Sequence, residues 1–297
     1  MLEKDPMDEI VEAVKSGKCI LFMGAAVHSA PPEGSAYIYP ETERPPIGSA
    51  FSKHLADNSD FAKVMPNEDV KNLQRVAQYY ELAKDRSNLV KEIKAAVVTD
   101  KKPSPVVRAL AELDFPIVIT TNYDRLFETA LRQVAGNPKD PFVSYYQINE
   151  NIPTVDFPYD EDFSAARPFL FKMHGDIEHP ESIVITDEDY IHFLLRMPAT
   201  GVYDPIPKSL QVQFKRWPTL FIGYSLKDYN LRVLFRTLRW KVDRAGFPRT
   251  YSIDLYPDPL IKTVFGDRGR FVSFIAQDVW TFVPELYRRI KNKEMPQ

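Results

Sequence analysis

The sequence predicts a doubly wound α/β fold, in which helices cover both faces of a parallel β-sheet. Several short segments are continuously apolar, as in strands that are buried on both faces of such a sheet. Helical patterns lie between these segments, and alternation of strand and helix is typical of α/β proteins. The expected strands are 18–24, 115–121, 169–174, 182–186, 219–224 and 249–255.

The helices are predicted from amphipathic spacing of apolar residues. The long stretch 69–98 is expected to hold two helices, and Pro284 is expected to interrupt the last helix, 278–293. The other expected helices are 5–16, 48–57, 104–113, 124–134 and 226–245.

Two segments break this alternation. Residues 30–47 contain five prolines, and residues 137–168 are rich in proline, aspartate and aromatic residues. Both could be plain surface loops, but loops of this length inside a compact domain often act as lids. We therefore expect one domain, 1–297, with two loop or lid insertions, and we leave open whether 30–47 covers a ligand.

Composition limits the class of protein. The chain has 297 residues, of which 44% are hydrophobic and 27% charged, and its net charge of −3 argues against a general nucleic-acid binder. No apolar run approaches the ~20 residues of a membrane span, and the acidic N-terminus is unlike a secretory signal. The lone cysteine, Cys19, argues against disulfides, fits a cytoplasmic location and excludes a four-cysteine zinc site.

Four expected strands end in small or polar residues, in the motifs GAAVHS, TNYD, HGD and GYSLKD. In an open parallel sheet, ligands bind beyond the carboxyl ends of the strands. The agreement among the four strand ends is stronger evidence for a binding site than any single motif. We therefore expect one shared mouth formed by Gly24, Asn122, Asp124, His174 and Ser225.

Each motif also has a plain structural explanation. GAAVHS is a weak phosphate signal, because Ala26 replaces a glycine of G-x-G-x-x-G, and it could be a simple strand-to-helix turn. Asn122 and Asp124 could cap the following helix. His174 could be a hydrogen-bonded structural residue, and Ser225 could cap the helix that follows it.

In order and approximate spacing, these motifs resemble the SIR2-like domains of bacteria, which are relatives of sirtuins. The Asn-x-Asp and His-Gly elements are the specific part, and the glycine loop is generic. Ala26 and Thr121 depart from the usual pattern, in which a glycine and a glutamine stand at these positions. The resemblance covers about residues 10–255 and implies a Rossmann-like sheet with helical insertions. A single cysteine means that the zinc-binding lobe of protein-deacylating sirtuins is not expected.

The resemblance implies an NAD+ hydrolase that cleaves the nicotinamide–ribose bond and depletes NAD+ in antiviral defence. Nicotinamide leaves as a neutral molecule, so the main barrier is positive charge that builds on the ribose. Asn122 is expected to orient a water or a ribose hydroxyl, and His174 to act as the general base. The other histidines lack metal-type spacing, so no metal is expected. We assign these histidines no role and leave a role open only for His28, in the first loop.

The dinucleotide is expected along the strand ends. The backbone of Gly24, Ala25 and Ala26 would take the pyrophosphate at a helix N-terminus. Asp124 would bind the nicotinamide carboxamide or favour positive charge nearby. Asp254 would meet a ribose or the adenine unless it merely forms a strand-end turn. The expected NAD+-binding residues are Gly24, Ala25, Ala26, Ser29, Thr121, Asp124, Gly223, Ser225 and Asp254.

Two other functions stay open at this point. One is an NAD-dependent deacylase or ADP-ribosyltransferase, and the other is an NAD- or ADP-ribose-binding scaffold that recruits an ATPase or a nuclease. Unrestrained NAD+ hydrolysis would be toxic, so gating by homo-oligomerisation or by a partner is expected. The resemblance suggests a HerA-type ATPase, or alternatively a short Argonaute, and neither direct nucleic-acid nor membrane binding is expected.

Overall fold

Seven parallel strands form one sheet in the computed structural model, which describes residues 5–149, 151–196, 204–224, 248–267 and 272–297. The strand order is β3-β4-β2-β1-β5-β6-β7, so the direction of winding reverses between β1 and β5. This arrangement confirms the predicted doubly wound α/β fold, and the reversal point is where such sheets bind ligands. The strands are β1 (Ile20–Met23), β2 (Ile117–Thr120), β3 (Phe142–Tyr145), β4 (Phe169–Lys172), β5 (Thr219–Ile222), β6 (Thr250–Ile253) and β7 (Val272–Ile275).

Five of the six expected strands are present, and the prediction for 182–186 is wrong. Ile183, Val184 and Ile185 are buried in extended chain, but no ladder forms there, although the Val184 N–H donates to the His174 carbonyl. Burial alone made this run look like a strand. The edge strands β3 and β7 were not predicted, because each is short and only partly buried.

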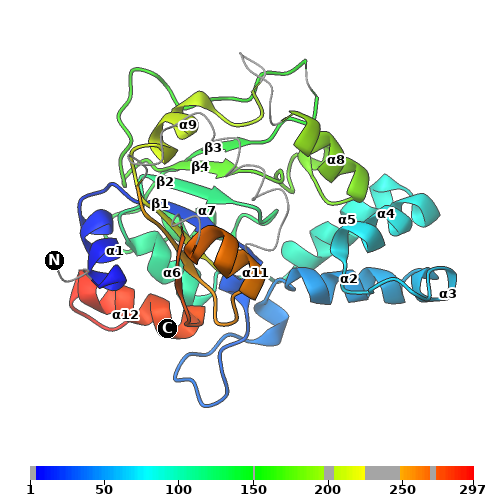
Figure 1. The fold of residues 1–297 in the computed structure, drawn as a ribbon, viewed down its shortest axis with the longest axis horizontal. Helices are drawn as coiled ribbons and strands as arrows, with labels where there is room; N and C mark the ends of the chain where they lie inside the picture. The colour runs from blue at the N-terminus through cyan, green and yellow to red at the C-terminus, as the bar shows by residue number, and fades with distance from the viewer. Residues whose placement is uncertain (1–4, 150, 197–203, 225–247, 268–271) are drawn as a thin grey trace.

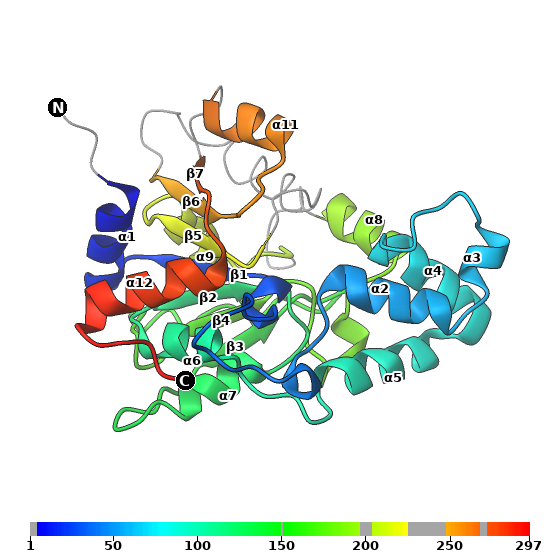
Figure 2. The same cartoon turned by 90° about the horizontal axis from the view of Figure 1, so that it is seen from below.

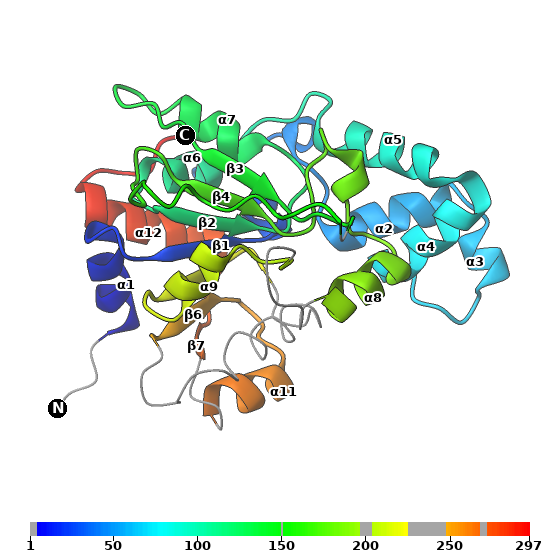
Figure 3. The same ribbon diagram turned by 90° about the horizontal axis from the view of Figure 1, so that it is seen from above.

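Alternate strand residues pack against helices on opposite faces of the sheet. Leu21 and Met23 belong to a core with α1 (Pro6–Lys15), α6 (Pro105–Glu112), α7 (Leu126–Arg132) and α12 (Val279–Lys291). Figure 2 shows α6, α7 and α12 on that face. Ile20 and Phe22 belong to a second core with α9 (Lys208–Phe214) and α11 (Pro259–Ile261), and Figure 3 shows α9 on the opposite face. The two cores explain why these strands are apolar at every position.

A helical insertion between β1 and β2 lies at one end of the sheet. It contains α2 (Gly48–Asp57), α3 (Phe61–Val64), α4 (Leu73–Lys84) and α5 (Arg86–Val97), and α4 packs against α8 (Asp187–Arg196). Figure 1 shows these helices together, on the far side of the molecule from α1 and α12. The insertion has its own apolar core, which includes Leu55, Val76 and Ile93. The two helices expected within 69–98 are confirmed, with the break at Asp85 in a positive-φ conformation.

The remaining helix predictions have different outcomes. The helices expected at 5–16, 48–57, 104–113 and 124–134 are present, while 226–245 lies outside the described residues. Helix α12 runs through Pro284 without a break, so the expected interruption is wrong. Four non-α helices complete the described elements. They are the 3₁₀ helices η1 (Ala25–His28), η2 (Glu41–Glu43) and η3 (Pro180–Ser182), and the π-helix η5 (Lys262–Asp267). Within the described part of the chain, every helix is too short or too polar to cross a bilayer.

Candidate active site

The ends of β1 and β5 fit together through two glycines. A Cβ at Gly24 would lie 2.5 Å from the Gly223 carbonyl oxygen, and a Cβ at Gly223 would lie 2.4 Å from the Val27 nitrogen. Gly223 also has φ +68°, a conformation that side chains other than glycine rarely adopt. The protein's own backbone therefore requires both glycines, whether or not a ligand is bound.

The close contact between Gly24 and Gly223 bears on the expected binding of the pyrophosphate by the first loop. The Gly24 N–H donates to the Ile222 carbonyl and the Ala26 N–H to the Gly223 carbonyl, each at 3.0 Å. The turn that follows, η1, is a four-residue 3₁₀ helix rather than the start of an α-helix. The N–H groups of Gly24 and Ala26 thus already have protein acceptors, and binding of the pyrophosphate by this loop stays a prediction.

The end of β2 presents Asn122 and Asp124. The Thr120 hydroxyl donates to the Met23 carbonyl and accepts from the Asn122 N–H, which ties this strand end to β1. The Asp124 Oδ1 atom accepts from the Leu126 N–H at 2.9 Å, so Asp124 satisfies the first amide of α7, although Arg125 is the N-cap residue. Its other oxygen, Oδ2, points toward His28. Asp124 therefore has the structural role that was left open, and one carboxylate oxygen remains for a second partner.

The end of β4 presents His174 in a fixed orientation. Gly175 follows with φ +91°, and a Cβ there would lie 2.3 Å from the Ser182 carbonyl oxygen. The His174 ring is 4% exposed and packs edge-on against Tyr190 and Phe193. Its Nδ1 lies 3.4 Å from the Tyr190 hydroxyl oxygen. The turn that follows β4 and two aromatic residues of α8 thus hold the imidazole in place.

These strand ends meet in a small cavity of about 140 Å³, which we call the inner chamber. Asn122 and His174 both line it, as do three further predicted residues, Ala25, Thr121 and Asp124. The helical insertion closes the other side with apolar side chains. The complete lining is Ala25, His28, Pro45, Pro46, Gly48, Phe51, Leu73, Ile93, Val97, Thr121, Asn122, Tyr123, Asp124, His174 and Tyr190.

A larger cavity of about 930 Å³ adjoins the inner chamber, and we call it the front cleft. The two share Ala25, Gly48, Thr121 and Tyr190, so the chamber is a recess of this cleft. The predicted residues Ala26 and Gly223 line the front cleft, next to Tyr224 at the end of β5. Lys71 and Arg75 add positive charge to its wall from the helical insertion, and Asp187 and Glu188 add negative charge from α8.

The structure does not bring every predicted residue into these two cavities. Ser29 lies beyond η1, where its hydroxyl accepts from the Trp280 indole N–H. The Asp254 carboxylate accepts from the Tyr256 N–H, which is the strand-end turn that was the alternative. Ser225 lies outside the described residues. Pro45 and Pro46 of the 30–47 segment line the chamber, while 137–168 contributes no residue to it or to the front cleft.

Sequence reasoning missed His28 and Tyr190. His28 is 3% exposed, and its Nε2 lies 3.7 Å from Asp124 Oδ2. Tyr190 comes from α8, 16 residues after His174, and the sequence carries no signal for its position. His28 lies inside the GAAVHS motif, so its place directly after β1 was the one available signal.

The surroundings of His28 define which of its nitrogens takes up a proton. The Tyr39 hydroxyl donates to the Lys102 carbonyl at 2.8 Å, so its oxygen accepts from His28 Nδ1–H at 3.2 Å. Nε2 is then the nitrogen that faces Asp124. Burial lowers the pKa of His28, and the negative charge of Asp124 only partly offsets this effect.

The lowered pKa of His28 predicts that the free energy of unfolding falls as the pH is lowered, and His28→Gln should weaken this pH dependence. As pH falls below about 6.5, His28 becomes protonated in the unfolded chain before it does in the folded protein. The free energy of unfolding therefore decreases until the pH reaches the pKa of His28 in the folded protein. Urea unfolding at several pH values should give a shallower dependence for His28→Gln, by up to about 1.4 kcal/mol per pH unit. His192→Gln, which removes an exposed histidine on α8, is the matched control. An unchanged slope in His28→Gln would contradict the prediction.

A buried group of charges lies directly beneath the site. Lys172 is fully buried, and its Nζ donates to the Asp124 carbonyl at 2.5 Å and lies 3.2 Å from Glu128 and 3.3 Å from Asp176. Arg125 also pairs with Asp176, at 2.9 Å. Burial raises the pKa of Glu128, and Lys172 only partly offsets this. Burial also opposes ionisation of Asp176, but Lys172 and Arg125 outweigh it and hold the pKa of Asp176 below its ordinary value.

This group of charges supports the chamber through the backbone. Lys172 bonds the carbonyl of Asp124, whose side chain lines the chamber, and Asp176 follows His174 by two residues. Among the residues that the structure describes, no cluster of three histidine, cysteine, aspartate or glutamate side chains is arranged to hold a metal ion. The arrangement brings a carboxamide, an imidazole and a carboxylate to one small chamber.

A doubly wound parallel sheet whose strand ends carry an Asn-x-Asp and a His-Gly element defines a SIR2-like protein. The family match agrees: residues 116–268, just over half of the chain, match the SIR2-like domain family. This chain therefore belongs to that family.

Relatives with assigned names support the same placement. The chain is 23% identical over 255 residues to defense-associated sirtuin 2 of Bacillus subtilis, covering 85% of this chain and 22% of that protein. It is 30% identical over 135 residues to the NAD(+) hydrolase ThsA of Enterococcus faecium, covering 45% and 24%. With ThsA of Acinetobacter baumannii (strain 532279), identity is 24% over 309 residues, covering 98% and 56%. The chain thus spans between about a fifth and just over half of these relatives.

Proposed function

We propose that this chain is an NAD+ hydrolase, which cleaves the bond between nicotinamide and ribose to give nicotinamide and ADP-ribose. The observation that carries the proposal is that Asn122 and His174, from two different strand ends, line one chamber of about 140 Å³. That chamber is a recess of the front cleft, which has room for the rest of a dinucleotide. Relatives named NAD(+) hydrolase support the proposal at 24–30% identity.

The chemistry follows from the leaving group. Nicotinamide in NAD+ is a pyridinium cation, so breaking the bond from its ring nitrogen to the anomeric carbon releases it neutral, and no general acid is needed. Positive charge then builds on the ribose, as in glycoside cleavage. Asn122 positions the water or a ribose hydroxyl with its carboxamide, and His174 accepts the proton as the water oxygen bonds to the anomeric carbon. Asp124 offers its second carboxylate oxygen to the amide of nicotinamide.

The front cleft would hold the remainder of NAD+. Ala26 and Gly223 present close backbone to the cleft. Lys71 would supply positive charge to the pyrophosphate, while Arg75 is paired with Glu68 and Asp187. Ser225 lies outside the described residues, and its binding role stays a prediction from the sequence. Asp254 and Ser29 have weaker claims to a binding role, because the side chains of both are engaged elsewhere.

We assign the activity to antiviral defence through NAD+ depletion in the cytoplasm. The supporting observation is that a relative is named a defense-associated sirtuin, and the relatives extend well beyond the region they share with this chain. Restraint of a toxic hydrolase by homo-oligomerisation, or by a HerA-type ATPase in preference to a short Argonaute, belongs to the same proposal.

Incubation of the purified chain with NAD+ alone tests the proposed reaction. Chromatography should show nicotinamide and ADP-ribose appearing in equal amounts without any acceptor. A deacylase or ADP-ribosyltransferase would need an acyl-lysine peptide or another acceptor for turnover. A scaffold would bind NAD+ or ADP-ribose and leave NAD+ intact, and that result would refute the hydrolase.

A further inference from the structure

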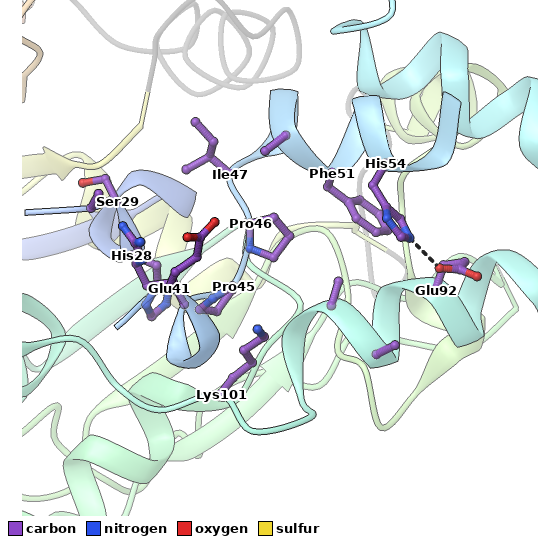
Figure 4. Close-up of a pocket in the computed structure, with 15 residues that line it drawn as sticks. His28, Ser29, Glu41, Pro45, Pro46, Ile47, Phe51, His54, Glu92 and Lys101 are labelled. Carbon is purple, nitrogen blue, oxygen red and sulfur yellow. Dashed lines mark hydrogen bonds and ion pairs between the residues drawn. The ribbon is translucent and has the colours of Figure 1, made fainter. Parts of the chain in front are cut away.

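A third cavity, of about 540 Å³, lies on the other side of the 45–47 segment, and we call it the rear pocket. Figure 4 shows it between η1, the proline segment, α2 and α5, with His28 at one end and the His54–Glu92 pair at the other. Its lining is His28, Ser29, Ala30, Glu41, Arg44, Pro45, Pro46, Ile47, Ala50, Phe51, His54, Glu92, Ala95, Ala96 and Lys101. The proposed function assigns it no role.

The inner chamber adjoins both the rear pocket and the front cleft, which also meet each other at Ile47. It shares His28, Pro45, Pro46 and Phe51 with the rear pocket, and a completely different set of residues with the front cleft. The four residues shared with the rear pocket therefore form a partition that is one side chain thick. The chamber thus has two boundaries, the front cleft on one side and this partition on the other.

The lining of the rear pocket favours a neutral, flat ligand. Eight of its fifteen residues are alanine, proline, isoleucine or phenylalanine, and these form the walls. Its two acidic side chains, Glu41 and Glu92, balance its two basic ones, Arg44 and Lys101, so the pocket does not select an anion. The rings of Phe51 and His54 lie nearly parallel, with an interplanar angle of 14°, on the α2 wall. Polar groups for an amide are present at both ends.

We propose that the rear pocket is a second binding site for the neutral pyridine carboxamide that the reaction releases. The inference rests on the proposed function, because that reaction supplies the ligand. When the nicotinamide–ribose bond breaks, ADP-ribose still fills the front cleft and blocks that boundary of the chamber. The partition of His28, Pro45, Pro46 and Phe51 is the other boundary, and the rear pocket behind it accepts the base. The two products thus occupy opposite sides of the partition.

Titration calorimetry with nicotinamide, on protein saturated with ADP-ribose, tests this site directly. The wild-type chain should bind nicotinamide at two sites, the inner chamber and the rear pocket. Ala96→Trp fills the rear pocket from α5 and should weaken the second event by at least about tenfold while the first remains. Lys94→Trp, at an exposed position on the same helix that does not line the pocket, should retain both events.

A second measurement locates the site and keeps the test independent of folding effects. Crystals soaked with 5-bromopyridine-3-carboxamide should show anomalous bromine density between α2 and α5. Ala50→Trp, which fills the pocket from α2, should remove that density. A single nicotinamide site in the wild type, or bromine in the inner chamber alone, would overturn the proposal. Because the experiments use nicotinamide and its brominated analogue rather than NAD+, they remain informative if NAD+ incubation shows no cleavage, and that outcome would refute only the proposed function.

Discussion

Replacing Asn122 with alanine should lower the rate of NAD+ cleavage by about 10²–10⁴-fold, and His174→Ala should have an effect of the same size. Asn122→Ala removes the carboxamide that positions the attacking water or ribose hydroxyl. His174→Ala removes the base that accepts its proton. Both side chains line the inner chamber, and the backbone around them is fixed by contacts that the substitutions leave in place.

The measurement is kcat and KM for nicotinamide release, together with the melting temperature of each variant. Asn67→Ala and His192→Ala remove the same side-chain types from exposed positions, and they should keep wild-type rates. Both site variants should also keep melting temperatures close to wild type. Wild-type rates in Asn122→Ala and His174→Ala would remove the proposed mechanism.

The largest effect on stability is expected from Lys172→Met. Methionine keeps an unbranched chain in the buried space but removes the ammonium group, which contacts the Asp124 carbonyl, Glu128 and Asp176. Glu128 is left without its cation, and Asp176 retains only Arg125. Removing one partner of a buried ion pair typically costs about 3–5 kcal/mol, because a buried charge is left uncompensated.

Urea unfolding of Lys172→Met at neutral pH should show this loss in the free energy of unfolding. Lys172→Met combined with Glu128→Gln should recover part of it, because the uncompensated carboxylate is then removed as well. Lys94→Met changes an exposed lysine on α5 and should leave stability unchanged. A loss below about 1 kcal/mol in Lys172→Met would show that water reaches the cluster and screens it.

Much of the fold could be predicted because its signals are local. Apolar runs such as 18–24 and 115–121 identified central strands, since a strand buried on both faces needs apolar residues at nearly every position. The same rule failed at 182–186, where the chain is buried without a partner strand. It also failed for β3 and β7, where edge positions relax the requirement for apolar residues.

The candidate site was predictable only where strand order decides it. Asn122 and His174 meet because both follow parallel strands, and that arrangement can be anticipated from the sequence alone. Tyr190 reaches the chamber from α8, and Phe51 reaches it from α2. Their positions depend on how the helical insertion packs, which no local pattern encodes. The backbone requirement for Gly24 could not be predicted for a related reason, because its close neighbour, Gly223, is almost 200 residues away in sequence.

The reciprocal fit of Gly24 and Gly223 has a consequence for protein engineering. A segment transplanted from another SIR2-like protein into either position meets a partner backbone shaped for this chain, and even one additional methyl group collides with it. Chimeras should therefore exchange residues 24–27 and residues 222–224 together, from the same donor protein. Evolution faces the same constraint, so these two distant stretches are expected to change together among homologues.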